Sequence, residues 1–353
     1  MRRFASLLAG AVLVGALVAA ATVQRAAGAP SAAARDARAL EADAATPVRP
    51  ARLAQVGEAP WHGGPTTTST GETVDVRVSD ALPADASSPQ QWAEFLASLL
   101  HGPELSQLTL YVETLPEVQE VCGSNALGCY AANEMVAPGE AAGDVGSAEI
   151  IRHEYGHHIA YHRVNPPWDA TDWGPKRWAS AENVCARVSR QEASPGDEGS
   201  NYMRNPGEAW AETYRLVDEL RAGITTETWP IVSASFFPSD PVLQAAAQDV
   251  VQPWTSGHST SATHVFGKRA SVWWTRLATP LDGTVRVSAS VPGRGAFDVA
   301  LVGANRRTLV ARAQFTGQLQ KRAETSVCGQ RTLFVRVTSK GAPGRVRFTA
   351  TTP

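Results

Sequence analysis

The sequence predicts an α+β domain followed by an all-β domain. At 353 residues the chain exceeds the usual size of one domain, which favours two folded units plus processing segments. Strand-like and helix-like stretches alternate up to about Ser256, and only short strand-like runs follow. Acidic and basic residues are interspersed, with a formal net charge of -2. Because no basic patch appears, nucleic acid is not an expected partner.

The N-terminus has the pattern of a secretory signal peptide. Two arginines precede an apolar run over residues 7–21, and small residues follow at 27–29. We therefore expect residues 1–29 to direct secretion, with a retained N-terminal anchor as the alternative. The apolar run falls short of the roughly 20 residues of a spanning helix, so stable membrane insertion is not expected. Residues 30–71 are rich in Ala, Pro, Thr and Arg, which indicates a linker or pro-segment.

Residues 72–255 are expected to form the α+β domain, which begins with a strand and a helix. Val74, Val76 and Val78 alternate with polar residues, as a half-buried strand requires. Ser88 followed by proline then gives an N-terminal capping signature. The apolar residues of one helical face come next: Trp92, Phe95, Leu96, Leu99 and Leu100.

Further strands and helices follow in this domain. Strands are predicted over 108–112 and over Tyr130 to Val136. Ser147 can cap a helix that Pro166-Pro167 stops, and Asn205-Pro206 opens another. The stretch between these helices is predicted to be mostly loop, with a helix around 182–190.

Residues 262–353 are expected to form a β-sandwich or jelly roll. The boundary is placed between Trp254 and Lys268, where Thr, Ser and Gly accumulate. Short alternating runs follow, without a helical period between them. Their apolar residues are Val285, Val287, Ala289 and Val291, then Leu333, Val335 and Val337, then Val346, Phe348 and Ala350.

Four cysteines in a secreted chain are expected to form disulfides, and three pairings are possible. Cys122 and Cys129 bracket a short loop with glycine at both ends, which can close on itself. Cys185 and Cys328 are then left for each other, and their bond would tie the C-terminal region to the preceding domain. A cysteine-ligated zinc would need closely spaced pairs such as C-x-x-C, which the sequence lacks.

The sequence His153-Glu154-Tyr155-Gly156-His157 has the H-E-x-x-H spacing of a metal site. Residues four apart share one helical face, so His153 and His157 can present two imidazole nitrogens to one ion. Glu154 projects beside them, where it can take a proton from water without being a ligand. The alternative is a histidine-rich polar face on a surface helix.

A catalytic zinc site with an open position needs a third protein ligand. The extended motif requires glycine at position 160 and a third histidine at position 163, and the sequence has Ala160 and Arg163 there. His162 lies one residue before the required position. A carboxylate on a second helix remains, and Glu208 and Glu212 are four apart there. Glu208 also has the spacing of a capping box with Asn205, in which case Glu212 would be the ligand.

Together, the H-E-x-x-H motif and the segment from Asn205 to Glu212 resemble the gluzincin metallopeptidases, with a lethal-factor-like or thermolysin-like catalytic core. The resemblance covers residues 72–225 and implies a zincin-like fold with an edge strand, the H-E-x-x-H helix and a second ligand helix. It implies that Glu208 is the third zinc ligand and that Glu212 orients a ligand histidine. It also implies that Tyr202 donates a hydrogen bond to the developing oxyanion.

The resemblance implies a secreted zinc-dependent endopeptidase in which Glu154 is the general base toward a metal-activated water. An extended peptide would pair with the edge strand, for which the segment from Tyr130 to Val136 is the candidate. Peptides or proteins are the expected substrates. The alternatives are a non-catalytic binding or adhesion protein with a vestigial zinc site, and a zinc amidohydrolase acting on non-peptide substrates.

The C-terminal β region resembles, without a sharp motif, the pre-peptidase C-terminal domains of secreted bacterial peptidases. The resemblance implies an accessory role. Trp273 and Trp274 are candidates for a binding face, although neighbours on a strand point to opposite sides.

Overall fold

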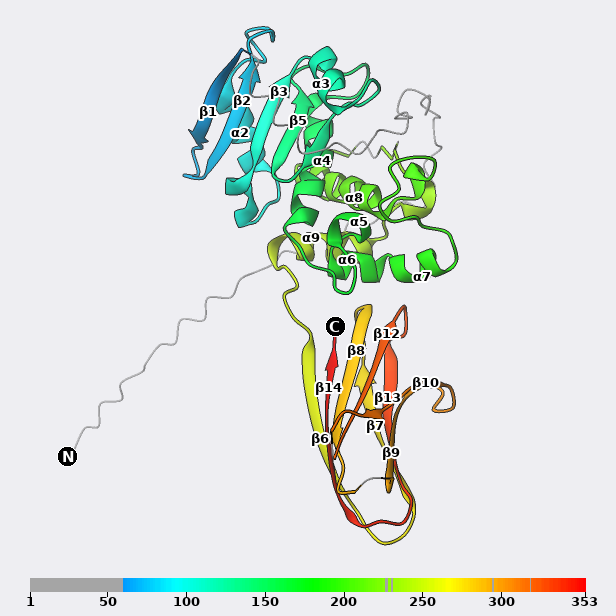
Figure 1. The fold of residues 1–353 in the computed structure, drawn as a ribbon. Coiled ribbons are helices and arrows are strands. Elements are labelled where there is room, and N and C mark those ends of the chain that lie inside the picture. Colours follow the sequence, from blue (N-terminus) through cyan, green and yellow to red (C-terminus); the bar gives the residue numbers. More distant parts are fainter. Residues whose placement is uncertain (1–59, 226–227, 230, 294, 318) are drawn as a thin grey trace, which may run out of the picture. The chain divides into compact units, whose positions relative to one another are not determined.

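The computed structural model describes residues 60–225, 228–229, 231–293, 295–317 and 319–353 (Figure 1). The predicted signal peptide and the predicted linker up to residue 59 lie outside these ranges. Helices and three sheets make up the described part of the chain, which confirms the α+β class. No helix in these ranges is both long enough and apolar enough to cross a membrane.

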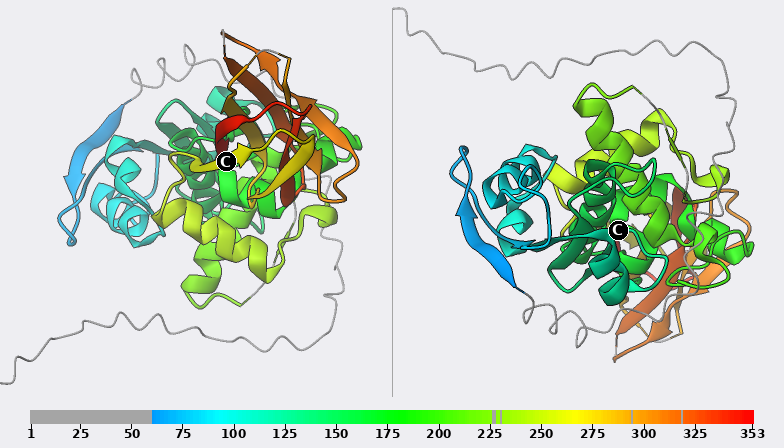
Figure 2. Two further views of the ribbon diagram at one scale, coloured as in Figure 1. Left: turned by 90° about the horizontal axis from the view of Figure 1, so that it is seen from below. Right: turned by 90° about the horizontal axis from the view of Figure 1, so that it is seen from above.

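The first sheet contains five strands in the order β1-β2-β3-β5-β4. Strands β2, β3 and β5 are parallel neighbours, whereas β1 and β4 run antiparallel to their neighbours at the two edges. In both views of Figure 2 the blue strand β1 lies on the side of the sheet away from the green helices. The strand bounds are β1 (Trp61–Thr67), β2 (Thr73–Ser79), β3 (Thr109–Glu113), β4 (Cys129–Ala131) and β5 (Glu134–Pro138).

Two of the predicted boundaries in this sheet are wrong. Residues 61–67 were placed in the linker, but they pair along their whole length with β2. The single strand expected from Tyr130 to Val136 is a hairpin, because Ala132 and Asn133 adopt φ angles of 49° and 76° and turn the chain. The edge strand is therefore β4 alone, and β5 lies inside the sheet.

Alternate side chains of the inner strands face two different cores. Leu110 and Met135 are fully buried in the larger core, whereas Tyr111 and Val136 belong to a smaller core on the opposite face. Helices α2 (Pro89–Ser98) and α4 (Ser147–Tyr161) contribute to the larger core, and α3 (Leu115–Cys122) contributes to the smaller one. As predicted, the Ser88 side chain caps α2.

Strand β3 ends at a buried carboxyl group, that of Glu113, which is 1% exposed. Among the residues that the structure describes, neither of its carboxylate oxygens has a hydrogen-bond partner. Burial, together with the nearby Glu117 and Glu120, raises its pKa from 4.5 to about 8. The folded chain therefore keeps a proton between pH 4.5 and 8 that the unfolded chain releases, so the free energy of unfolding falls as pH rises through this window.

The substitution Glu113→Gln is expected to remove this loss of stability. At pH 8 the variant should be more stable than the wild type by on the order of 3 kcal/mol, and the two should converge near pH 4.5. Chemical denaturation across this pH range measures the difference. Glu140→Gln is the matched control, because it removes an exposed carboxylate that does not contribute to the pKa shift of Glu113. If both variants show the same pH dependence, Glu113 is not the responsible group.

The remaining helices follow the first sheet. Helix α4 begins after Gly146, and Ser147 is its first residue rather than its cap. The region expected to be mostly loop contains three short helices, one of which lies within the predicted 182–190. The bounds of these helices are α5 (Ala170–Trp173), α6 (Lys176–Ala181), α7 (Val184–Ser189), α8 (Pro206–Arg221) and α9 (Asp240–Val251). The bounds of the 3-10 helices are η3 (Pro103–Gln107), which lies between α2 and β3, η4 (Tyr202–Arg204) and η5 (Ala234–Phe236).

The C-terminal part consists of two antiparallel sheets whose buried residues form one hydrophobic core, as expected for a β-sandwich. One sheet has the order β10-β9-β13-β7 and the other has the order β11-β12-β8-β14-β6. Trp273 packs against the core, and Trp274 lies beneath the guanidinium groups of Arg306 and Arg336. The bounds are β6 (His258–Phe266), β7 (Ser271–Ala278), β8 (Gly283–Ser290), β9 (Phe297–Gly303), β10 (Leu309–Arg312), β11 (Gln314–Phe315), β12 (Gln320–Val327), β13 (Thr332–Ser339) and β14 (Gly344–Thr352).

Both predicted disulfides are confirmed. Cys122 bonds to Cys129 and closes the loop between α3 and β4. Cys185 bonds to Cys328 and links α7 to the turn after β12. No free cysteine remains.

Candidate metal centre

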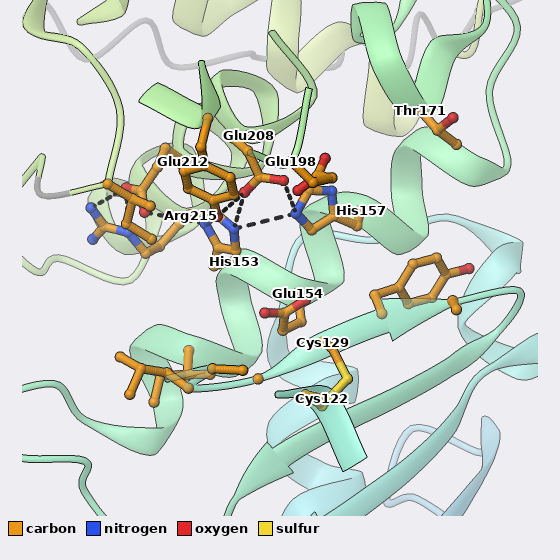
Figure 3. Close-up of a pocket in the computed structure, with 18 of the residues that line it drawn as sticks. Cys122, Cys129, His153, Glu154, His157, Thr171, Glu198, Glu208, Glu212 and Arg215 are labelled. Atoms are coloured by element: carbon orange, nitrogen blue, oxygen red, sulfur yellow. Dashed lines mark hydrogen bonds and ion pairs between the residues drawn. A yellow bond between two sulfur atoms is a disulfide. The ribbon is translucent and has the colours of Figure 1, made fainter. Parts of the chain in front are cut away.

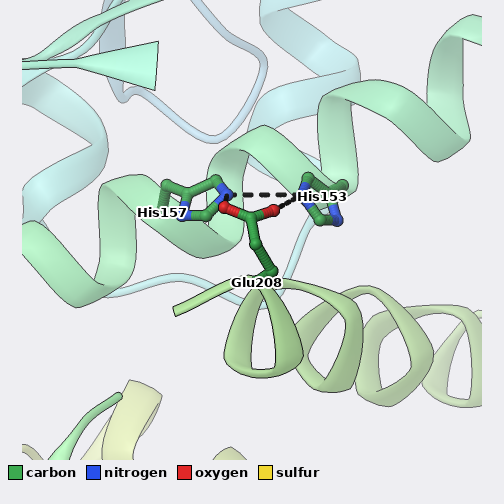
Figure 4. Close-up of side chains that lie close together, drawn as sticks. All are labelled: His153, His157 and Glu208. Atoms are coloured by element: carbon green, nitrogen blue, oxygen red, sulfur yellow. Dashed lines mark hydrogen bonds and ion pairs between the residues drawn. The ribbon is translucent and has the colours of Figure 1, made fainter. Parts of the chain in front are cut away.

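Helices α4 and α8 bring two imidazoles and one carboxylate together (Figure 4). The Nε2 atoms of His153 and His157 are 3.3 Å apart. Glu208 reaches both rings, with Oε2 at 3.1 Å from Nε2 of His153 and Oε1 at 3.4 Å from Nε2 of His157. The three side chains could hold a metal ion, and no other group of His, Cys, Asp and Glu within the described ranges has this property.

The close approach of the two helices depends on a glycine. A Cβ atom added to Gly156 would lie 2.7 Å from Cα of Ala211 in α8, closer than real Cβ atoms come to other atoms. The carbonyl oxygen of Gly156 also accepts a hydrogen bond from Nε1 of Trp210 at 2.7 Å. The absence of a side chain at this position therefore lets α8 pack against α4 so closely that Glu208 reaches the histidines.

A carboxylate from α8 holds the far nitrogen of His153. Nδ1 of His153 donates to Oε1 of Glu212 at 3.1 Å, which leaves Nε2 on the side of Glu208. The other oxygen of Glu212 accepts two hydrogen bonds from Arg215, at 2.9 and 2.7 Å. Burial opposes ionisation of Glu212, but Arg215 and His153 together outweigh burial and lower the pKa of Glu212.

The structure does not place Glu208 in a capping box. The side chain of Asn205 caps α8 by accepting from the backbone N–H of Gly207 at 3.0 Å. The carboxylate of Glu208 instead contacts the two histidines and the hydroxyl of Tyr202, which donates to Oε2 at 2.6 Å. Tyr202 thus lies in the site, with its hydroxyl on the carboxylate between the imidazoles.

Glu154 lies beside this group and makes no hydrogen bond within the described ranges (Figure 3). It is 8% exposed, and burial raises the pKa of its carboxyl group, whereas His153 and His157 lower it. The chain at Gly128 packs against it: a Cβ atom there would lie 3.0 Å from Oε1 of Glu154. Gly128 belongs to the disulfide-closed loop, so this loop contacts the candidate base.

The site opens into a cavity of about 400 Å³. One wall is apolar and comes from the disulfide loop, β4 and the start of α4, with Leu127, Tyr130 and Ile150 among its residues. Asp172 and Glu198 also line the cavity. Burial, followed by the nearby Glu208, raises the pKa of Glu198 to about 7.

Three residues at this site, Arg215, Asp172 and Glu198, were not predicted from the sequence. Arg215 stands three residues after Glu212 on the same helix, and this spacing is a signal from which their ion pair could have been predicted. Asp172 and Glu198 lie in short loops and helices far from the motifs, and no local pattern marks them.

Comparisons with known proteins give little further information. The chain matches none of the known protein families and none of the curated proteins. Among solved structures, it is similar to the pre-peptidase C-terminal domain of a collagenase from Bacillus anthracis. The sequence identity is 11%, the match covers 27% of this chain and 89% of that chain, and the TM-score is 0.22.

Proposed function

We propose that this chain is a secreted zinc-dependent endopeptidase. The observation that carries the proposal is the grouping of His153, His157 and Glu208 around one point, with Glu154 beside it and unbonded. Two imidazoles and one carboxylate form a ligand set that leaves a fourth position open, as catalytic zinc sites do. A purely structural site would have no need of a free carboxyl group at its edge.

The donor atoms fit zinc. A tetrahedral zinc site with bonds of about 2.0–2.1 Å has ligand atoms separated by about 3.3 Å. The two Nε2 atoms here are 3.3 Å apart, and they lie 3.1 and 3.4 Å from the two different carboxylate oxygens of Glu208. With one ligand atom taken from each residue, the three atoms lie within 4.8 Å of one another. When bound, the ion would supply a Lewis acid that polarises the scissile carbonyl and lowers the pKa of water to about 7.

Glu154 is proposed to move the proton. Its unbonded carboxylate takes a proton from the attacking water and then gives it to the leaving amine, which breaks the peptide C–N bond. Tyr202 is proposed to donate its hydroxyl hydrogen to the carbonyl oxygen as negative charge develops there. In the structure the hydroxyl donates its single hydrogen to Glu208, so this role requires it to turn from the carboxylate to the carbonyl oxygen. Burial followed by this carboxylate raises its pKa well above 10, so the hydrogen is retained.

The peptide is proposed to bind as an additional strand along β4. Within the described ranges this strand lies at the edge of the sheet and pairs only with β5, so one side of its backbone remains available. Residues 129–131 also line the cavity that contains the candidate metal centre. A peptide paired with β4 therefore extends past Glu154.

The test is cleavage of casein by the purified chain, with and without 1,10-phenanthroline. We expect hydrolysis that the chelator abolishes and that added Zn²⁺ restores. Cleavage that resists the chelator would contradict the proposal. If the chain binds zinc but cleaves no peptide, it is a zinc-containing binding protein or a hydrolase of non-peptide amides.

A further inference from the structure

The candidate metal helix carries a second pair of histidines that the proposed chemistry does not use. His158 lies on α4 and His162 is the C-cap residue of this helix, with ring centroids 4.7 Å apart. Neither ring belongs to the group that could hold a metal ion. Both rings instead form hydrogen bonds to the β4–β5 hairpin, one to Tyr130 and one to Asn133.

The partners of His158 determine the direction of its hydrogen bonds. Nε2 lies 2.9 Å from the backbone carbonyl oxygen of Glu104, which can only accept, so Nε2–H is the donor. The other nitrogen of the neutral ring is then an acceptor. The hydroxyl of Tyr130 lies 3.0 Å from Nδ1 and therefore donates to it.

The same hydroxyl is bonded to the turn of the hairpin. The backbone N–H of Asn133 donates to the Tyr130 oxygen at 3.0 Å. The side-chain oxygen of Asn133 accepts from Nε2 of His162 at 2.6 Å. A continuous chain of hydrogen bonds thus runs from the hairpin turn through Tyr130 and His158 to the carbonyl of Glu104.

We infer that Tyr130 and His158 are positioning residues that fix the edge strand β4 relative to the candidate metal centre, with Asn133 and His162 as a second connection. Strand β4 has three residues and one neighbouring strand, so its own ladder holds it weakly. His153 and His157 belong to the same helix as His158, and His162 is the C-cap residue of that helix. One helix therefore carries both the ligand pair and the attachment of the strand that receives the peptide.

This inference rests on the proposed endopeptidase function, and Tyr130→Phe tests it. The variant keeps the ring and removes the hydroxyl that joins the hairpin to His158. With fluorescein-labelled casein we expect KM to rise about 10-fold, because the strand is no longer held for pairing, while kcat stays within about 2-fold. Zinc content should equal that of the wild type. An unchanged KM, or a fall in kcat alone, would overturn the inference.

Tyr155→Phe is the matched control. This tyrosine is also buried on α4 and contacts the ring of His158, but its hydroxyl has no hydrogen-bond partner in the part of the chain that the structure describes. Its loss should leave KM unchanged. Asn133→Gly is a second variant, because glycine accepts the φ of 76° and keeps the N–H donor to Tyr130 while the bond to His162 is lost. We expect an increase in KM of about 3-fold for this variant.

Amide hydrogen exchange separates this inference from the proposed function. In the full chain, Tyr130→Phe should speed exchange across residues 129–136 by about 10-fold, whereas Tyr155→Phe should not. If the wild type cleaves no casein, the proposed function fails, and the exchange result alone decides whether Tyr130 positions the strand. Equal exchange in the wild type and in Tyr130→Phe would overturn the positioning role.

Discussion

Glu154→Gln is expected to abolish casein hydrolysis while the protein still binds zinc. The amide has the shape of the carboxylate but cannot take a proton from water, and loss of a general base typically costs about 10² to 10⁴ in rate. Glu154 is not one of the three side chains that could hold the ion, so the ligand set stays complete. The measurements are kcat with casein and zinc content by elemental analysis.

The matched control for this experiment is Glu140→Gln, an exposed position outside the cavity, which should leave both values unchanged. Wild-type kcat in the Glu154 variant would remove the proposed mechanism. Loss of zinc together with activity would show instead that Glu154 is needed to bind the ion.

Glu208→Ala is expected to lose zinc, whereas Glu212→Gln is expected to bind it more weakly. Glu208 lies against both imidazoles, whereas Glu212 contacts one of them, at the nitrogen of His153 that faces away from Glu208. Loss of an orienting partner typically costs about 10- to 100-fold in metal affinity, and loss of one of three ligands should cost considerably more. Zinc affinity measured by competition with a chromophoric chelator compares the two variants.

The glutamine at position 212 is chosen because its single side-chain oxygen can still accept from the buried Arg215, while its NH2 group takes the place of the oxygen that accepts from Nδ1 of His153. An alanine there would remove one of the two carboxylates that lie 2.7 Å from the buried Arg215, and the protein would be destabilised for reasons unrelated to the metal. If Glu212→Gln weakens zinc binding more than Glu208→Ala, the ligand assignment is reversed and Glu212 binds the ion.

The elements with a strong local pattern were predictable from the sequence. The cap at Ser88, the helix carrying His153 and His157, the antiparallel C-terminal sheets and both disulfides follow from residues close together in the chain or from simple pairing. Helix α9 was missed, although Asp240-Pro241 at its start is a recognisable N-terminal signal. Its existence could therefore have been predicted.

Other features depend on contacts that no local pattern contains. Strand β1 includes Gly63, Gly64 and Pro65, which hide any alternation, and its pairing with β2 alone defines it. The hairpin turn begins at Ala132, which is not a typical turn residue at a positive φ. From the sequence, Glu208 and Glu212 were the candidates for the third metal ligand, and the choice between them depends on how α4 and α8 pack.

The packing at Gly156 has a consequence for reading the H-E-x-x-H motif in this chain. Tyr155 and Gly156, between the two histidines, contribute no atom to the group that could hold the metal. Position 156 must nevertheless be glycine, because even a methyl group there would collide with Ala211. An alanine at this position would preserve every donor side chain of the motif and still move the carboxylate of Glu208 out of reach. The candidate metal centre therefore depends on its three ligand side chains and also on the absence of a Cβ atom at position 156.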